Sequence, residues 1–176
     1  MNQFTSSILV LLVVLSFHGV TADVVNDVCR KASGSNPSVT YGFCSKSFEA
    51  NPKSRSSNIY GIGEISMELA LRKAASVTSL INTILNGGGK VSPDVRGALV
   101  SCQNNYKTVV RSVQGAISAY KGRDLAGANQ QIYNAMDAGQ SCKDEFQAGM
   151  VSPTEKDVQD FVLLTYISYT IIGMNA

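Results

Sequence analysis

The apolar residues of this chain recur at helical spacing over most of its length. Between residues 58 and 86 they fall at three- and four-residue steps, which places them on one face of a long helix. Similar stripes run through residues 93–120 and 125–142. Residues 153–173 are apolar nearly all round, a pattern typical of a helix buried on several sides. The pattern therefore predicts four long helices.

The segments between these stripes carry signals for the ends of helices. Three glycines at residues 87–89 stop the first helix, and Ser92 and Pro93 supply an N-cap and a first helical residue for the second. Asp124 is placed to cap the third helix, and residues 152–155 (Ser-Pro-Thr-Glu) form a capping box before the fourth. Because the connections are short, we expect an up-down-up-down four-helix bundle.

Two shorter helices are predicted ahead of the bundle, at residues 23–31 and 41–50, with a turn over residues 33–38. Residues 1–22 have the form of a secretory signal peptide, with an unbroken apolar run over residues 8–17 and small residues before the cleavage point. The run is shorter than the roughly 20 residues that a membrane span needs. We expect cleavage to leave one domain, residues 23–176.

The chain has four cysteines, Cys29, Cys44, Cys102 and Cys142, and an even number in a secreted protein indicates disulfides. Three pairings are possible. Sequential pairing is favoured because the first two cysteines lie in one short N-terminal segment. The expected fold class is therefore all-α: a four-helix bundle preceded by a disulfide-stapled N-terminal α-hairpin, with the second disulfide between adjacent helices.

The composition argues against catalysis. The only histidine, His18, lies in the expected leader, so the mature chain would lack the usual general base and the commonest metal ligand. Triad chemistry and ordinary zinc sites are then excluded. Paired carboxylates could still hydrolyse glycosides, but each pair lies among polar neighbours typical of a solvated face. These pairs are Glu64 with Glu68, Asp144 with Glu145, and Asp157 with Asp160. We predict no enzyme activity, no catalytic residue, no metal and no cofactor.

Other classes of partner find little support. The formal net charge is +2 and the basic residues are scattered, which disfavours nucleic-acid binding. Residues 161–176 resemble a C-terminal anchor signal, but polar residues interrupt them, so we expect a core helix and no stable membrane anchor. Residues 61–66 begin like a dinucleotide fingerprint but end in Ser66 with no strand before them. We expect the glycines there to permit close packing or a bend.

Several segments together resemble the plant invertase and pectin methylesterase inhibitor family, and most of all its small pollen-allergen subgroup. The likeness extends over essentially all of the expected mature chain. The matching segments are residues 28–29, 41–44, 50–54, 99–106, 126–146, 151–153 and 163–168.

The resemblance implies the disulfides Cys29–Cys44 and Cys102–Cys142, an extracellular location in the apoplast or cell wall, and a protein target. That target would be an acid invertase or a pectin methylesterase, inhibited by a one-to-one complex over its active-site cleft. Well-studied invertase inhibitors carry a Pro-Lys-Phe motif in the loop before the helix that bears the fourth cysteine. Here residues 121–126 read Lys-Gly-Arg-Asp-Leu-Ala, so those contact residues cannot be carried over.

Exposure and charge suggest a contact site of this chain's own. We expect Lys121, Arg123 and Asp124 to lie at one end of the bundle, where the loop could enter the cleft of a target enzyme, and we expect a monomer. The alternative function is a non-inhibitory secreted carrier, with a small apolar ligand held in a cavity lined by the last helix.

Overall fold

The structure is a computed structural model that describes residues 19–87, 91–147 and 149–176. These residues form six α-helices and one short 3-10 helix, with no strand among them. The expected leader, residues 1–22, lies outside the described residues except for its last four, which fall in the first helix. An all-α fold is therefore confirmed.

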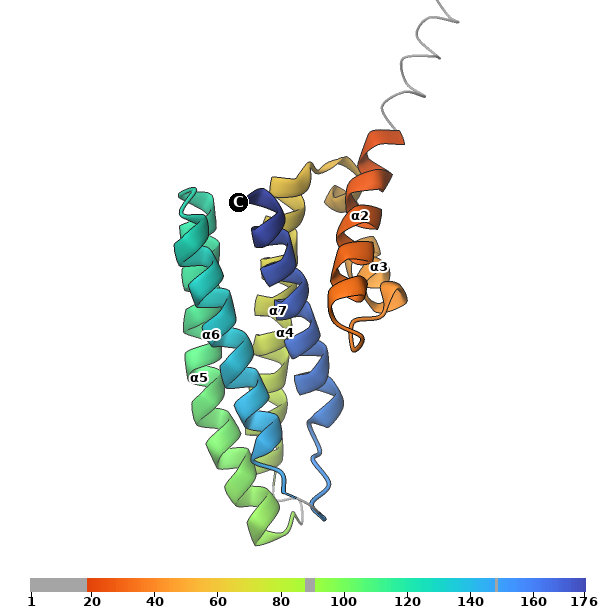
Figure 1. The fold of residues 1–176 in the computed structure, drawn as a ribbon. Helices are drawn as coiled ribbons and strands as arrows, with labels where there is room; N and C mark the ends of the chain where they lie inside the picture. The colour runs from red at the N-terminus through yellow and green to blue at the C-terminus, as the bar shows by residue number, and fades with distance from the viewer. Residues whose placement is uncertain (1–18, 88–90, 148) are drawn as a thin grey trace, which may run out of the picture.

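Four long helices make the bundle (Figure 1): α4 (Ile59–Asn86), α5 (Pro93–Lys121), α6 (Leu125–Asp144) and α7 (Glu155–Asn175). Each packs against the next, and α7 returns to α4, which closes the ring in the predicted up-down-up-down order. Ser92 Oγ accepts a hydrogen bond from the N–H of Val95 at 3.3 Å, so the predicted cap of α5 forms.

The last helix begins two residues later than its capping box predicts. Ser152 Oγ accepts from the N–H of Thr154 rather than from that of Glu155, and the intervening residues form a turn. The apolar character of α7 on nearly all sides has a simple cause. This helix packs on α4 and α6 within the bundle and also carries α2 on its outer side.

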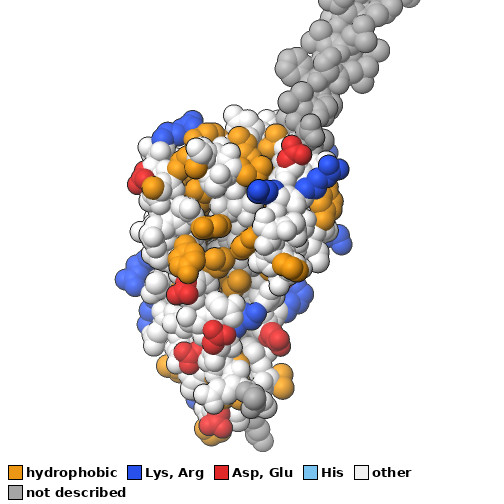
Figure 2. Space-filling model, in the orientation of Figure 1, with side chains coloured by type: hydrophobic (Ala, Val, Ile, Leu, Met, Phe, Trp, Pro, Cys, Tyr) orange, Lys and Arg blue, Asp and Glu red, His pale blue; other side chains and the backbone are white. Residues whose placement is uncertain are grey.

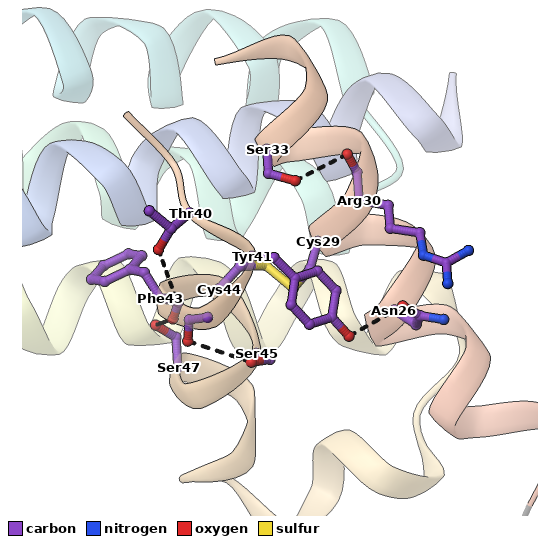
Figure 3. Close-up of a disulfide and its surroundings, with 11 residues drawn as sticks. Asn26, Cys29, Arg30, Ser33, Thr40, Tyr41, Phe43, Cys44, Ser45 and Ser47 are labelled. Carbon is purple, nitrogen blue, oxygen red and sulfur yellow. Dashed lines mark hydrogen bonds between the residues drawn. A yellow bond between two sulfur atoms is a disulfide. The ribbon is translucent and has the colours of Figure 1, made fainter. Parts of the chain in front are cut away.

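A stapled α-hairpin precedes the bundle, made of α2 (Gly19–Ser35) and α3 (Tyr41–Glu49), and a 3-10 turn η1 (Pro52–Ser56) follows it. The disulfide Cys29–Cys44 joins the two helices, as Figure 3 shows, and beside it Tyr41 Oη donates to Asn26 Oδ1 at 3.1 Å. Helix α2 runs past its predicted end because helical hydrogen bonding continues as far as the N–H of Asn36, which bonds the carbonyl of Ala32.

Two apolar cores hold these parts together. The first fills the bundle axis, where the rings of Tyr106 and Phe161 are 5.6 Å apart, and the disulfide Cys102–Cys142 joins α5 to α6 beside it. The second lies between the hairpin and the bundle. Its buried members include Phe48 from α3 and Ile167 from α7. Because α7 contributes to both cores, the hairpin is fixed to the bundle.

Close helix packing at one end of the bundle depends on Gly63. A Cβ atom at this position would lie 2.2 Å from Tyr120 Oη, far inside contact distance. The phenol of Tyr120 therefore occupies the space beside α4 that a side chain would take. Of the two glycines in residues 61–66, Gly63 therefore permits the close packing that the sequence analysis expects.

Candidate functional site

The turn between α5 and α6 lies at the end of the bundle that also holds the start of α4 and the C-terminus (Figure 1). Lys121 is the last residue of α5, and Asp124 immediately precedes α6. Residues 121–124 are all exposed. The structure thus places the three expected contact residues together on one exposed turn, and their contact with a partner stays a prediction.

Arg123 is held in an unusual backbone conformation. Its φ of 64° lies in the left-handed region that residues other than glycine seldom adopt. Its guanidinium carbon lies 3.8 Å from the centroid of the Tyr60 ring, a cation–π contact that fixes the side chain on α4. The ion pairs found in the described ranges involve only Lys73 and Lys156. The guanidinium is therefore positioned, yet free to donate to a partner's carboxylate.

Asp124 has a structural task in the same turn. Its Oδ1 accepts a hydrogen bond from the N–H of Gly127 at 2.8 Å, which makes it the N-cap of α6 as the sequence predicts. The negative charge also lies at the positive end of the helix dipole. Within the turn, Asp124 shapes the backbone, while Lys121 and Arg123 present the free charges.

Replacement of Asp124 by alanine should lower the free energy of unfolding by about 1 kcal/mol, because the cap and its charge are both lost. Asp124→Asn retains an acceptor for the N–H of Gly127 and should lose much less. Urea unfolding followed by circular dichroism measures both variants. Equal losses in the two would contradict a capping role.

A group of side chains beneath Arg123 ties the turn to two other helices. The rings of Tyr60 and Tyr120 are 5.3 Å apart, and Asn175 Nδ2 donates to Tyr120 Oη at 3.0 Å. Burial, with the neighbouring Tyr60 and Glu64, raises the pKa of Tyr120 to about 12. The sequence pattern did not reveal this support, because its members come from three helices far apart in the chain. This group of side chains supports the turn, so the surface of the turn is already formed before a partner binds.

Stability should fall in alkali because buried tyrosines resist ionisation in the folded state. The pKa of Tyr120 is about 12 in the fold, and burial also raises the pKa of Tyr106 above its ordinary value. An unfolded tyrosine ionises near pH 10. Between about pH 10 and 12 the unfolded state therefore binds fewer protons, and stability declines as pH rises. Urea unfolding at pH 8, 10 and 11.5 should show the decline, and Tyr120→Phe should reduce it. An equal decline in that variant would contradict the assignment.

One carboxylate pair considered for catalysis is engaged in ion pairs. Lys73 Nζ lies 3.2 Å from Asp157 Oδ1 and 3.4 Å from Asp160 Oδ2, which links α4 to α7. Lys156 Nζ also bonds Asp160 at 2.8 Å. This network serves helix packing. In the ranges that the structure describes, no group of three or more His, Cys, Asp or Glu residues could hold a metal ion, and no helix there is long and apolar enough to cross a membrane.

Comparison with known proteins identifies the family. Residues 23–171 match the family model described as plant invertase/pectin methylesterase inhibitor, and the chain belongs to this family. A "Putative invertase inhibitor" of Platanus orientalis is 38% identical over 157 residues, which cover 88% of this chain and 91% of the relative.

More distant relatives carry the other name of the family. "Pectinesterase inhibitor 1" of Arabidopsis thaliana is 26% identical over 144 residues, which cover 82% of this chain and 76% of that protein. The crystal structure of a mutant form of a pectin methylesterase inhibitor from Arabidopsis superposes with a TM-score of 0.72. It is 21% identical, and the match covers 85% of this chain and 95% of that one. At this identity the likeness establishes the fold alone.

Proposed function

We propose that this protein is a secreted inhibitor of a plant carbohydrate-active enzyme, either a pectin methylesterase or an acid invertase. It would act in the apoplast as a monomer, by a one-to-one complex over the active site of its target. The observation that carries the proposal is the family match over residues 23–171, together with relatives named as inhibitors of both kinds of enzyme.

The architecture supports inhibition by a preformed surface. Two disulfides and the shared core hold the helices, and the Tyr60 and Tyr120 rings support the turn at residues 121–124. A rigid surface loses little conformational entropy on docking, so more of the contact energy remains for affinity. The turn is exposed at the end of the bundle and carries two cations with no ion pair among the described residues, which suits contact with carboxylates at the mouth of a cleft.

The test is a titration of the oxidised mature protein, residues 23–176, against an acid invertase and a pectin methylesterase between pH 4.5 and 7. Stoichiometric loss of one activity would support the proposal and identify the target. Partner carboxylates and histidines titrate in this range, so we expect the affinity to change with pH. Full activity of both enzymes at a large molar excess of the protein would overturn the proposal.

Reversing the charge of Arg123 should weaken inhibition at least tenfold, since a buried interfacial charge of the wrong sign costs about 1.4 kcal/mol or more. The variant is Arg123→Glu. Arg111→Glu is the matched control, because Arg111 is exposed in the middle of α5 and its replacement changes the net charge by the same amount. Inhibition constants from enzyme titrations measure both. Equal inhibition constants for Arg123→Glu and the native protein would place the contact surface elsewhere.

A further inference from the structure

The N-terminal segment formed by α2, α3 and η1, residues 19–57, carries all of the chain's net positive charge. It contains five lysines and arginines against three carboxylates, a net charge of +2, which equals that of the full chain. The cations are Arg30, Lys31, Lys46, Lys53 and Arg55. All ion pairs in the described part of the chain involve α7, so none of these cations has a carboxylate within 4 Å there. Figure 2 shows several lysine or arginine side chains, in blue, on the side of the molecule where Figure 1 places α2.

A pocket of about 210 Å³ opens among α2, α3 and η1 in this basic region. Its apolar lining comes from the buried ring of Phe48 and from the half-buried side chain of Val25. Tyr41 stands at the edge with 45% of its surface exposed, and its hydroxyl is tied to Asn26 across the hairpin (Figure 3). An exposed aromatic ring is thus held rigidly beside a small hollow.

Polar groups line the rest of the pocket. Ser54 is buried, and its Oγ has no hydrogen-bond partner among the described residues. Arg55 and Glu49 contribute opposite charges from neighbouring elements, and the amide nitrogen of Asn26 retains its donors beside the bond to Tyr41. The Ser54 oxygen is itself out of reach of solvent, so the polar groups left for a ligand are those of Asn26, Glu49 and Arg55.

This combination matches a sugar ring that bears a carboxylate. The apolar face of a pyranose can stack on the Tyr41 ring, while ring hydroxyls bond Asn26 and Glu49. A guanidinium such as that of Arg55 binds a carboxylate through two parallel hydrogen bonds. The pocket is smaller than the roughly 300–1,000 Å³ that encloses a whole small molecule, which favours one residue of a longer chain.

We propose that this pocket binds one residue of an acidic polysaccharide, a uronide chain, and that the surrounding cations of α2, α3 and η1 bind the adjoining carboxylates. The site is separate from the turn between α5 and α6 and goes beyond the inhibitory function. Its role would be to hold the protein on an acidic carbohydrate matrix.

The test is calorimetric titration of the oxidised mature protein with a de-esterified oligogalacturonide of about ten residues. The same oligosaccharide with its carboxyls reduced to alcohols and a polyaspartate of equal charge serve as comparison ligands. We expect binding of the oligogalacturonide that weakens with salt, at least fivefold weaker binding of the reduced chain, and weaker binding of polyaspartate. Absence of binding, or equal binding of polyaspartate, would overturn the proposal.

Variants locate the site. Arg55→Gln and Tyr41→Ala should each weaken binding at least fivefold, whereas Arg111→Gln, which removes the same charge from α5, should change it less than twofold. The side chain of Arg55 makes no hydrogen bond or ion pair within the described residues, so its replacement should leave the fold intact. Equal weakening by Arg111→Gln would mean a diffuse charge effect and no site. Inhibition of an enzyme acting on a small soluble substrate should be unchanged in Arg55→Gln, so the two proposals can fail separately.

Discussion

Loss of the disulfide between α5 and α6 is expected to lower the free energy of unfolding by about 4 kcal/mol. The bond closes a loop with a sequence separation of 40 residues, and chain entropy in the unfolded state grows with that separation. For a domain of this size the effect corresponds to a fall in melting temperature of roughly 10 °C. The variant is Cys102→Ala with Cys142→Ala, and thermal unfolding followed by circular dichroism measures it.

The hairpin disulfide provides the comparison. Cys29 and Cys44 are separated by 15 residues, so the same model gives a smaller loss of about 3 kcal/mol. The pair of measurements tests the loop-length argument as well as the pairing. An unchanged melting temperature in either double variant would mean that the corresponding bond does not contribute to the stability of the fold.

Replacement of Gly63 by alanine is expected to lower the free energy of unfolding by about 1–3 kcal/mol, although alanine favours helix. The new methyl group would lie 2.2 Å from Tyr120 Oη and 2.6 Å from its Cζ, so the buried ring must move. Its hydrogen bond from Asn175 and its contact with Tyr60 would both be disturbed. Urea unfolding measures the loss.

Gly97 is the matched control, because it also lies within a helix but has no atom within 4 Å of its Cβ position. Gly97→Ala should therefore raise stability by about 0.5–1 kcal/mol. Combination of Gly63→Ala with Tyr120→Phe removes the clashing oxygen and should recover part of the loss. A gain of stability in Gly63→Ala would show that the close approach is not a constraint.

Local sequence signals were sufficient for the bundle. The apolar stripes and the caps at Ser92 and Asp124 predicted helix number, order and most boundaries, because these features depend on residues a few positions apart. The capping box at residues 152–155 misplaced the start of α7, since Ser152 bonds the nearer N–H of Thr154. Such competition between adjacent donors is not visible in a pattern.

The candidate site was likewise only partly predictable from the sequence. Exposure of residues 121–124 followed from their composition and their place between two helices. The stacking of Arg123 on Tyr60 and the bond from Asn175 to Tyr120 could not be predicted, because each joins residues more than fifty positions apart. The pairing of Lys73 with Asp157 and Asp160, which joins two helices, could not be predicted either. These contacts arise from the register of packed helices, which hydrophobic spacing alone leaves undetermined.

The sharing of α7 between the two cores has a consequence for biosynthesis. Phe48 and its neighbours on the hairpin dock against Ile167, which leaves the ribosome long after the hairpin does. Ile62 and Ile65 of α4 join the same core earlier, but the hairpin face that meets α7 stays uncovered until that last helix is made. The hairpin's own cysteines are close in sequence, so their oxidation can proceed during this interval and present a preformed unit to α7 when that helix arrives.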